Sequence, residues 1–319
     1  MKRTMLLLVT LILAAAAVYA GGGSEKAKQE TLFMNIGTGG TAGTYYPMGG
    51  AIAEIINANV PGVNSTAVST GASVANINKL GEGEFQMIFV QNDVTYYAYN
   101  GTEMFQERSY PTLRGIATLY SETIHIVTVE GAGIRSFADL RGKRIAVGAA
   151  GSGTEGNARQ ILEVLGLTYN DIRPQYLSFA EAANGLRDGT VDAAVVTAGV
   201  PTAAIRDVAA QRNVVIVPVP DDLADPLIAR YPFYTKFTIP AGTYPGQNSP
   251  VQTIAVKAML VVDASLDEQI AYNITKAIFE NVNRIALAHA QGRAISVETA
   301  DEGMPVPLHP GAERYFNER

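Results

Sequence analysis

A unit of strand, glycine-rich loop and helix occurs three times along the chain, and it constrains the fold more than any other feature. The loops begin at Gly37 (GTGGTAGTYYP), Ser69 (STGAS) and Gly148 (GAAGSGTEG), and each follows a short apolar segment and precedes a helix-like one. Strands that alternate with helices at this spacing are typical of parallel sheets with crossover helices. The repeated unit therefore predicts an α/β fold.

Long strand-like segments predict that the chain passes twice between two lobes. Residues 113–119 and 124–129 are separated by only four residues and favour one long strand, while residues 252–262 suit a strand that crosses back. A length of 319 residues also favours two domains, at roughly 100–200 residues each. We expect a sheet with flanking helices in each lobe and a hinge at the two crossing strands. The expected boundaries assign residues 31–121 and 252–319 to lobe 1 and residues 122–251 to lobe 2.

Two other segments carry predictions about local structure. Residues 267–289 place apolar side chains three to four positions apart, which predicts one continuous amphipathic helix. Residues 220–250 are rich in proline and tyrosine, so we expect mostly loop with one short helix there.

Each glycine-rich loop offers the chemistry of an anion site. The backbone N–H groups at the start of a helix have no partner within the helix, and the helix dipole adds partial positive charge. In doubly wound sheets such loops gather at the carboxyl ends of the strands, where ligands bind. The sequence thus predicts an anionic ligand in a cleft between the lobes, although tight turns alone would also explain any single loop.

A dinucleotide site is a sharper interpretation of two of these loops. Residues 151–156 fit G-x-G-x-x-G and residues 37–42 fit G-x-G-x-x-A. A dinucleotide fold also needs an acidic residue ~20 positions on, at the end of the next strand. Those strands end at Phe179 and Ser69, and neither residue is acidic. Neither loop contains the Gly-Lys-Ser/Thr of a phosphate-binding P-loop. We therefore expect no cofactor.

Composition excludes several classes of function. The chain has no cysteine, which removes thiolate nucleophiles, disulfides and thiolate metal sites, and its three histidines are scattered at His125, His289 and His309. The net charge is −6, from 24 basic and 30 acidic residues, and it leaves no basic excess for nucleic acid or an anionic membrane. We expect no metal site and no nucleic-acid partner.

Catalytic arrangements are equally sparse. Ser152 is flanked by glycines but does not stand in G-x-S-x-G, and His125 lies in the middle of a strand, which favours a packed residue over a general base. Asp93 and Glu122 are a possible carboxylate pair, but in a binding protein such groups more often hold an ammonium or orient a hydroxyl. We expect no enzymatic activity.

The amino terminus has the pattern of a secretory signal peptide. Lys2 and Arg3 precede an apolar run over residues 5–18, and Val18-Tyr19-Ala20 suits cleavage near Ala20. An uncleaved anchor is the alternative, but the run is shorter than the ~20 residues of a spanning helix. Cleavage leaves a polar leader over residues 21–30, which we expect to be flexible, and a net charge of 22 − 30 = −8. We expect an exported, periplasmic protein, in a space without a supply of ATP or NAD.

Five motifs in order carry a family resemblance: GTGGTAGTYYPMGGAIA, STGASVANI, FVQNDV, GAAGSGTEGNAR and IPAGTYPGQ. Together they resemble the TAXI family of TRAP-transporter solute receptors over nearly the whole mature chain. The resemblance implies a two-lobed, periplasmic-binding-protein-like fold of type II that captures a small organic anion and delivers it to an ion-gradient-driven membrane permease. Members of this family are associated with glutamate, glutamine and related carboxylates, including keto acids.

Carried over to this sequence, the resemblance also implies ligand-binding residues. They are Thr38, Gly39, Thr41, Thr44 and Tyr45, then Ser69, Thr70 and Ser73, then Asn92 and Asp93, then Tyr120, then Ser152, Gly153 and Thr154, and finally Thr197, Ala198, Gly199 and Pro201. A better-known group of TRAP receptors grips a carboxylate with an arginine, whereas these loops contain no arginine or lysine. Carboxylate capture would then rest on helix N-termini and hydroxyls. An ionised Asp93 in the cleft would favour a ligand that also carries an ammonium.

The sequence therefore predicts a monomeric, exported solute-binding protein with a glutamate-like ligand and a TRAP permease as its membrane partner. Two alternatives stay open. One is a binding protein of similar fold that serves an ABC importer. The other is an α/β enzyme that uses the Gly151 loop for a phosphorylated cofactor.

Overall fold

A mixed β-sheet organises residues 31–319, which are the residues that the computed structural model describes. Its strands follow the order β2-β1-β3-β10-β4-β7-β5-β6, with β8 added to β4 and β9 added to β10. The strands are β1 (Leu32–Gly37), β2 (Val63–Val68), β3 (Met87–Gln91), β4 (Leu113–Val129), β5 (Arg144–Ala146), β6 (Arg173–Gln175), β7 (Ala193–Ala198), β8 (Val214–Val217), β9 (Thr235–Ile239) and β10 (Val251–Asp263). The signal-peptide and leader predictions concern residues outside this range.

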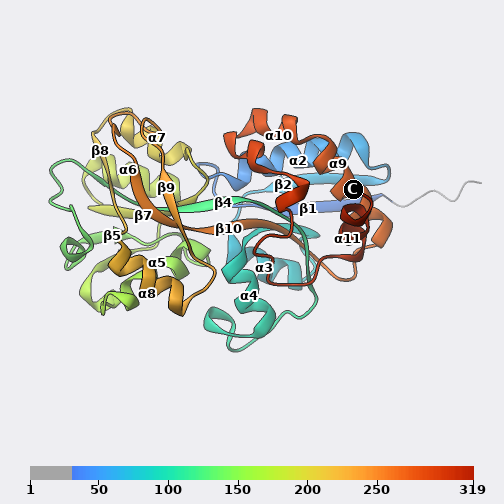
Figure 1. Ribbon diagram of the computed structural model, residues 1–319, viewed down its shortest axis with the longest axis horizontal. Helices are drawn as coiled ribbons and strands as arrows, with labels where there is room; N and C mark the ends of the chain where they lie inside the picture. Colours follow the sequence, from blue (N-terminus) through green and yellow to red (C-terminus); the bar gives the residue numbers. More distant parts are fainter. Residues whose placement is uncertain (1–30) are drawn as a thin grey trace, which may run out of the picture. The chain divides into compact units, whose positions relative to one another are not determined.

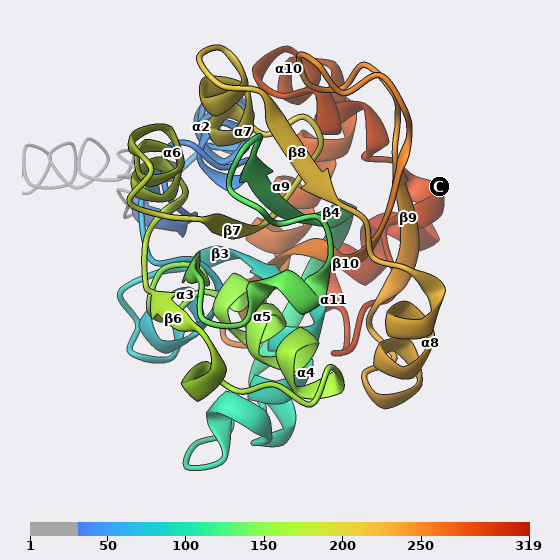
Figure 2. The ribbon, with the colours of Figure 1, turned by 90° about the vertical axis from the view of Figure 1, so that its left-hand side faces the viewer.

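Helices cover both faces of both halves of the sheet (Figure 1). In one half α2, α9 and α10 lie on one face and α3 and α4 on the other; in the second half α6 and α7 lie opposite α5 and α8. Figure 2 shows α5 and α6 on opposite sides of β7. The helices are α2 (Tyr45–Asn59), α3 (Ser73–Gly81), α4 (Asn92–Asn100), α5 (Gly153–Val164), α6 (Phe179–Asp188), α7 (Ala203–Ala209), α8 (Asp221–Arg230), α9 (Glu268–Glu280), α10 (Val282–Ala288) and α11 (Pro310–Asn317).

The two longest strands, β4 and β10, belong to both halves of the sheet. β10 pairs with β3 through residues 258–262 and with β9 through residues 251–255. β4 pairs with β7 and β8 through residues 123–129, and the two long strands pair with each other in antiparallel fashion. The structure confirms the two predicted crossing strands, including the single strand over residues 113–129. The lobe boundaries and the hinge stay predictions.

Strand direction differs between the interior of each half and the junction. β1 and β3 are parallel, as are β5 with β6 and β5 with β7, which agrees with the strand–loop–helix units. β10 is antiparallel to β3, and β4 is antiparallel to β7. The prediction of a parallel sheet therefore holds within each half, while the crossing strands make the whole sheet mixed.

The predicted helix over residues 267–289 is wrong as one element, because it is broken at Asn281. This residue has φ −126° and ψ 23°, and its Nδ2 donates to the Ala277 carbonyl, so its side chain competes with the helical backbone. The prediction of mostly loop over residues 220–250 also missed β9. Its TKFTI sequence pairs with residues 251–255 of β10 within a proline-rich stretch.

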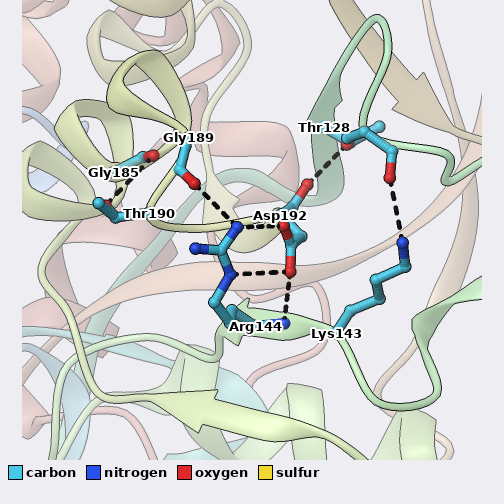
Figure 3. Close-up of polar contacts among 8 residues, drawn as sticks. Thr128, Lys143, Arg144, Gly185, Gly189, Thr190 and Asp192 are labelled. Carbon is cyan, nitrogen blue, oxygen red and sulfur yellow. Dashed lines mark hydrogen bonds and ion pairs between the residues drawn. The ribbon is translucent and has the colours of Figure 1, made fainter.

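An arginine–aspartate pair fixes the start of β5 against the turn before β7 (Figure 3). Arg144 Nη2 lies 2.6 Å from Asp192 Oδ1 and also donates to the Gly189 carbonyl, while the Arg144 backbone N–H donates to Asp192 Oδ2. The Asp192 carbonyl in turn accepts from Thr128 Oγ1 of β4 at 2.7 Å. The pair thus sets the register of β5, which leads into the third glycine-rich loop.

The dependence of the fold on the crossing strands can be measured with two leucine substitutions. Leu260 of β10 is fully buried, so Leu260→Ala should lower the free energy of unfolding by about 2–5 kcal/mol in urea denaturation. Leu287 of α10 is 89% exposed, and Leu287→Ala should change it by no more than about 0.5 kcal/mol. Equal losses in the two variants would contradict this assignment of the core.

Candidate functional site

The three glycine-rich loops meet at a small cleft of about 60 Å³ between the two halves of the sheet. The loops after β1 and β2 reach it from one half, and the loop after β5 reaches it from the other. The ends of β3 and β7, the middle of β4 and the start of α6 complete its walls. The lining residues are Gly39, Gly40, Gly43, Thr44, Tyr45, Thr70, Gly71, Ala72, Ser73, Gln91, Glu122, Ala149, Ser152, Gly153, Thr154, Ser178, Phe179, Thr197 and Ala198.

The structure brings together ten of the residues that the sequence predicted for the site. These ten line the cleft: Gly39, Thr44, Tyr45, Thr70, Ser73, Ser152, Gly153, Thr154, Thr197 and Ala198. The other eight are not among the lining residues: Thr38, Thr41, Ser69, Asn92, Asp93, Tyr120, Gly199 and Pro201.

Several of these eight side chains hold the loops in place. Thr38 Oγ1 donates to the Val68 carbonyl at 2.7 Å, and Ser69 Oγ donates to the Gly39 carbonyl at 3.1 Å, so both tie the first loop to the second. Asn92 Nδ2 donates to the Gly303 carbonyl and its Oδ1 accepts from the Lys257 backbone N–H. These contacts position the backbone that borders the cleft.

Among the lining residues that the prediction left out, Gln91 and Glu122 carry the most chemistry. Gln91 stands at the end of β3, directly before the Asn92 and Asp93 that were predicted, so the adjacent strand end was the available signal. Glu122 was weighed only as a partner of Asp93, and its place in the cleft depends on the register of β4. Ser178 and Phe179 enter from the start of α6.

Helix starts from opposite halves of the sheet line the cleft, those of α3 and α5 together with those of α2 and α6. Ser73 begins α3, Gly153 begins α5, and both line the cleft. The side chain of Ser152 accepts from the Glu155 N–H and caps α5. Unpaired N–H groups and the positive ends of the helix dipoles favour an anion between them. Among the lining residues that the structure describes, none is lysine or arginine.

Glu122 is the acidic group of the cleft, and burial changes its titration. Its Oε2 accepts a hydrogen bond from the Tyr45 hydroxyl at 2.6 Å, and the residue is only 3% exposed. Burial raises the pKa of Glu122 to about 8, because a charged carboxylate loses hydration there, while the Tyr45 bond acts in the opposite direction. The carboxyl is therefore largely protonated near neutral pH and ionises when a positive group approaches.

Asp93 lies behind the cleft wall. It is 1% exposed, and its Oδ2 accepts from Asn157 Nδ2 at 2.9 Å. Burial raises the pKa of Asp93 to about 6, which leaves it ionised at neutral pH. We expected Asp93 to favour a ligand ammonium only if it lay in the cleft. Asp93 is not among the lining residues, whereas Glu122 is.

His125 is packed, as predicted. Its Nδ1 lies 3.1 Å from the Val196 carbonyl and its Nε2 lies 3.0 Å from the Tyr244 hydroxyl. Burial lowers the pKa of His125 to about 4, so the ring is neutral, with Nδ1–H as donor and Nε2 as acceptor. The Tyr244 hydroxyl also accepts from the Thr202 N–H, which fixes the loop that follows β7.

Direct hydrogen bonds join the two sides of the cleft at its rim. The Gly199 N–H donates to Thr44 Oγ1 at 3.0 Å, and the Ala75 N–H donates to the Gly151 carbonyl at 3.0 Å. These bonds hold the two halves together beside the cleft. Within residues 31–319, no cluster of three His, Asp or Glu side chains has a metal-binding arrangement, and no helix has the length and apolar character that crossing a bilayer needs.

The chain belongs to the NMT1-like family, whose model matches residues 36–319. Its fold is that of periplasmic-type binding proteins. A protein from Bordetella bronchiseptica RB50 is 16% identical with a TM-score of 0.53, covering 90% of this chain and 89% of its own. A putative L-cystine ABC transporter protein from Listeria monocytogenes is 13% identical with a TM-score of 0.52, covering 85% and 98%. The zinc-bound ligand-binding component of an ABC-type import system from Staphylococcus aureus is 10% identical with a TM-score of 0.50, covering 90% of both chains.

The raised pKa of Glu122 predicts a pH-dependent stability. The pKa of the Glu122 carboxyl is about 8 in the folded protein and near its ordinary value of 4.5 in the unfolded chain. Its contribution to stability is therefore fully present below pH 4.5 and is lost as the pH rises toward 8. Between pH 6.5 and 8 this loss amounts to about 1.5 kcal/mol. Glu122→Gln keeps an acceptor for Tyr45 and should remove this slope in urea denaturation.

Titration of the histidines does not account for this difference in slope. Burial lowers the pKa values of His125, His289 and His309, so their linkage acts mainly below pH 6.5 and is present in both proteins. A slope between pH 6.5 and 8 that is the same in wild type and Glu122→Gln would show that Glu122 does not titrate as described.

Proposed function

We propose that the protein is an exported solute-binding protein that captures a small organic carboxylate in this cleft and delivers it to a membrane transporter. The observation that carries the proposal is the meeting of two helix N-termini, from α3 and α5, in one small cleft between halves that share two strands. Such a cleft closes around a ligand by a hinge movement at the shared strands. Catalysis has no part in this function.

The lining groups favour a carboxylate that is held by neutral donors. Backbone N–H groups of the helix starts line the cleft together with the hydroxyls of Thr44, Ser73, Ser152 and Thr154. The hydroxyls of Tyr45, Thr70 and Thr197 also line it but already donate within the protein. A neutral hydrogen bond contributes a net ~0.5–1.5 kcal/mol, and one to a charged group contributes more. Glutamate or a related amino or keto acid is the ligand that the sequence resemblance supports.

Two transport systems are candidates for the membrane partner. The resemblance to TAXI receptors supports a TRAP permease driven by an ion gradient. The ABC-type systems named for two of the similar structures support an ABC importer about as well. A neighbouring gene for a large permease would favour the first, and one for an ATPase would favour the second. Export to the periplasm is common to both, and N-terminal sequencing of the exported protein would test cleavage near Ala20.

A thermal-shift screen separates binding from cofactor chemistry. A carboxylate present at 100 times its dissociation constant should stabilise the folded protein by about 2.7 kcal/mol and raise the melting temperature by about 5 °C or more. NAD, FAD and nucleotides should give no shift. A clear shift with a nucleotide cofactor and none with amino or keto acids would instead support the α/β enzyme.

Gly153 offers a structural test of the same function. A Cβ added there would overlap the amide oxygen of Gln91, so Gly153→Ala should keep α5 away from β3 and lower carboxylate affinity at least tenfold in calorimetry. Gly50→Ala in α2 is the matched control, because nothing lies within 4 Å of its added Cβ. Circular dichroism confirms that both variants fold, and unchanged affinity in Gly153→Ala would contradict this assignment of the cleft.

A further inference from the structure

Gln91 carries the unpaired polar atom of the cleft wall. The residue is 2% exposed and lines the cleft, and its Oε1 has no hydrogen-bond partner among the residues that the structure describes. Gly153 lies directly against this oxygen, since a Cβ there would overlap it. A buried acceptor without a partner costs free energy, so a donor supplied by a ligand would be favourable here.

Asn157 on α5 decides which end of the Gln91 amide is left without a partner. Gln91 Nε2 donates to Asn157 Oδ1 at 2.9 Å, and Thr197 Oγ1 donates to the same oxygen at 3.0 Å. With its nitrogen held by Asn157 in this way, the oxygen is the end of the Gln91 amide that is left without a partner.

The orientation of Asn157 is fixed in turn. Its Nδ2 donates to Asp93 Oδ2 at 2.9 Å and to the Tyr234 hydroxyl at 2.8 Å. An ionised carboxylate only accepts, and the Tyr234 proton is already donated to Gln160 Oε1 at 2.5 Å. Rotating the Asn157 amide would therefore place oxygen against oxygen on both sides. Asn157 uses all four of its hydrogen-bonding positions in one orientation.

We propose that Asp93, Asn157 and Gln91 form an orientation relay that makes Gln91 a specificity-determining residue, presenting a fixed acceptor to a solute that carries an ammonium beside its carboxylate. The relay selects α-amino acids over the matching 2-oxo acids. The inference rests on the proposed function and adds the substrate class to it. The starts of α3 and α5 receive the carboxylate, and Gln91 receives an N–H of the ammonium.

The chemistry of the two solute classes differs at one atom. An α-amino acid presents N–H donors next to its carboxylate, whereas a 2-oxo acid presents a carbonyl oxygen at the same place. That oxygen would face Gln91 Oε1 and leave two acceptors unpaired. Sites built to pair with a donor reject analogues that lack it strongly, so we expect a preference of at least tenfold. Glu122, in the same cleft, adds a carboxyl that ionises beside the ammonium.

The relay also spans the two halves of the sheet. Gln91 and Asp93 come from β3 and α4 in one half, while Asn157 and Thr197 come from α5 and β7 in the other. The acceptor is therefore oriented only when the halves are together. Selection of the solute and closure of the cleft depend on the same hydrogen bonds.

The test compares matched solute pairs by calorimetry at pH 7: L-glutamate with 2-oxoglutarate, and L-leucine with 4-methyl-2-oxopentanoate. In whichever pair binds to the wild type, the affinity for the amino acid should be at least tenfold higher than the affinity for its 2-oxo acid. Asp93→Asn removes the obligatory acceptor and lets both amides rotate, so this ratio should fall at least fivefold. Asp207→Asn changes the charge equally at an exposed position of α7 and should leave the ratio unchanged.

A second variant keeps the test decisive if Asp93→Asn does not fold. Gln91→Met has a similar shape but no amide oxygen, and it should also lower the ratio at least fivefold while circular dichroism shows the native fold. If the wild type binds the 2-oxo acid as tightly as the amino acid, this inference is overturned and the proposed function still stands. An unchanged ratio of affinities in the folded variants has the same consequence. Wild type that binds no carboxylate overturns the proposed function.

Discussion

The antiparallel pairing of β4 with β10 is the constraint on which the rest of the structure depends. Ala258 of β10 is the registered neighbour of Gln91 on one side and of Tyr120 on the other, so a single position aligns β3 and β4. Farther along β4, Thr123 is paired with Ala198 at the end of β7. The strand ends of both halves therefore meet beside Glu122. A shift of one residue would turn every side chain to the opposite face and dismantle the cleft.

This dependence explains what could be predicted from the sequence. The glycine-rich loops and the long strands are local patterns, and the structure has both, with the loops meeting at one cleft. Gln91 was left out although it ends β3 directly before two predicted residues, so a local signal for it was present. Glu122 was left out because its position follows from register between distant strands, for which no local pattern exists. The break at Asn281 and the β9 strand were missed for a related reason, since a side-chain hydrogen bond and a distant partner strand outweighed helical periodicity and proline content.

The charge of the protein gives little guide to its proposed ligand. The chain carries a net −6, and no lysine or arginine is among the described lining residues, yet the cleft suits an anion. Attraction must therefore be local, from oriented N–H groups that need no reorganisation when the ligand arrives. Such dipoles act strongly in a closed, poorly hydrated cleft, where the effective dielectric constant is low. A neutral Glu122 avoids the repulsion that a fixed second anion would cause.

In the proposed hinge movement, closure and recognition share their free energy. Bringing α5 onto β3 is possible because Gly153 has no side chain, and it buries the Gln91 oxygen without a partner. An unmade hydrogen bond of this kind costs about 1–3 kcal/mol, so the closed empty state is penalised by that amount relative to the open one. A solute that supplies the donor removes the penalty only in the closed state, and a ligand shifts a conformational equilibrium by its differential affinity for the two states. In this proposal, one glutamine links what the cleft accepts to when it closes.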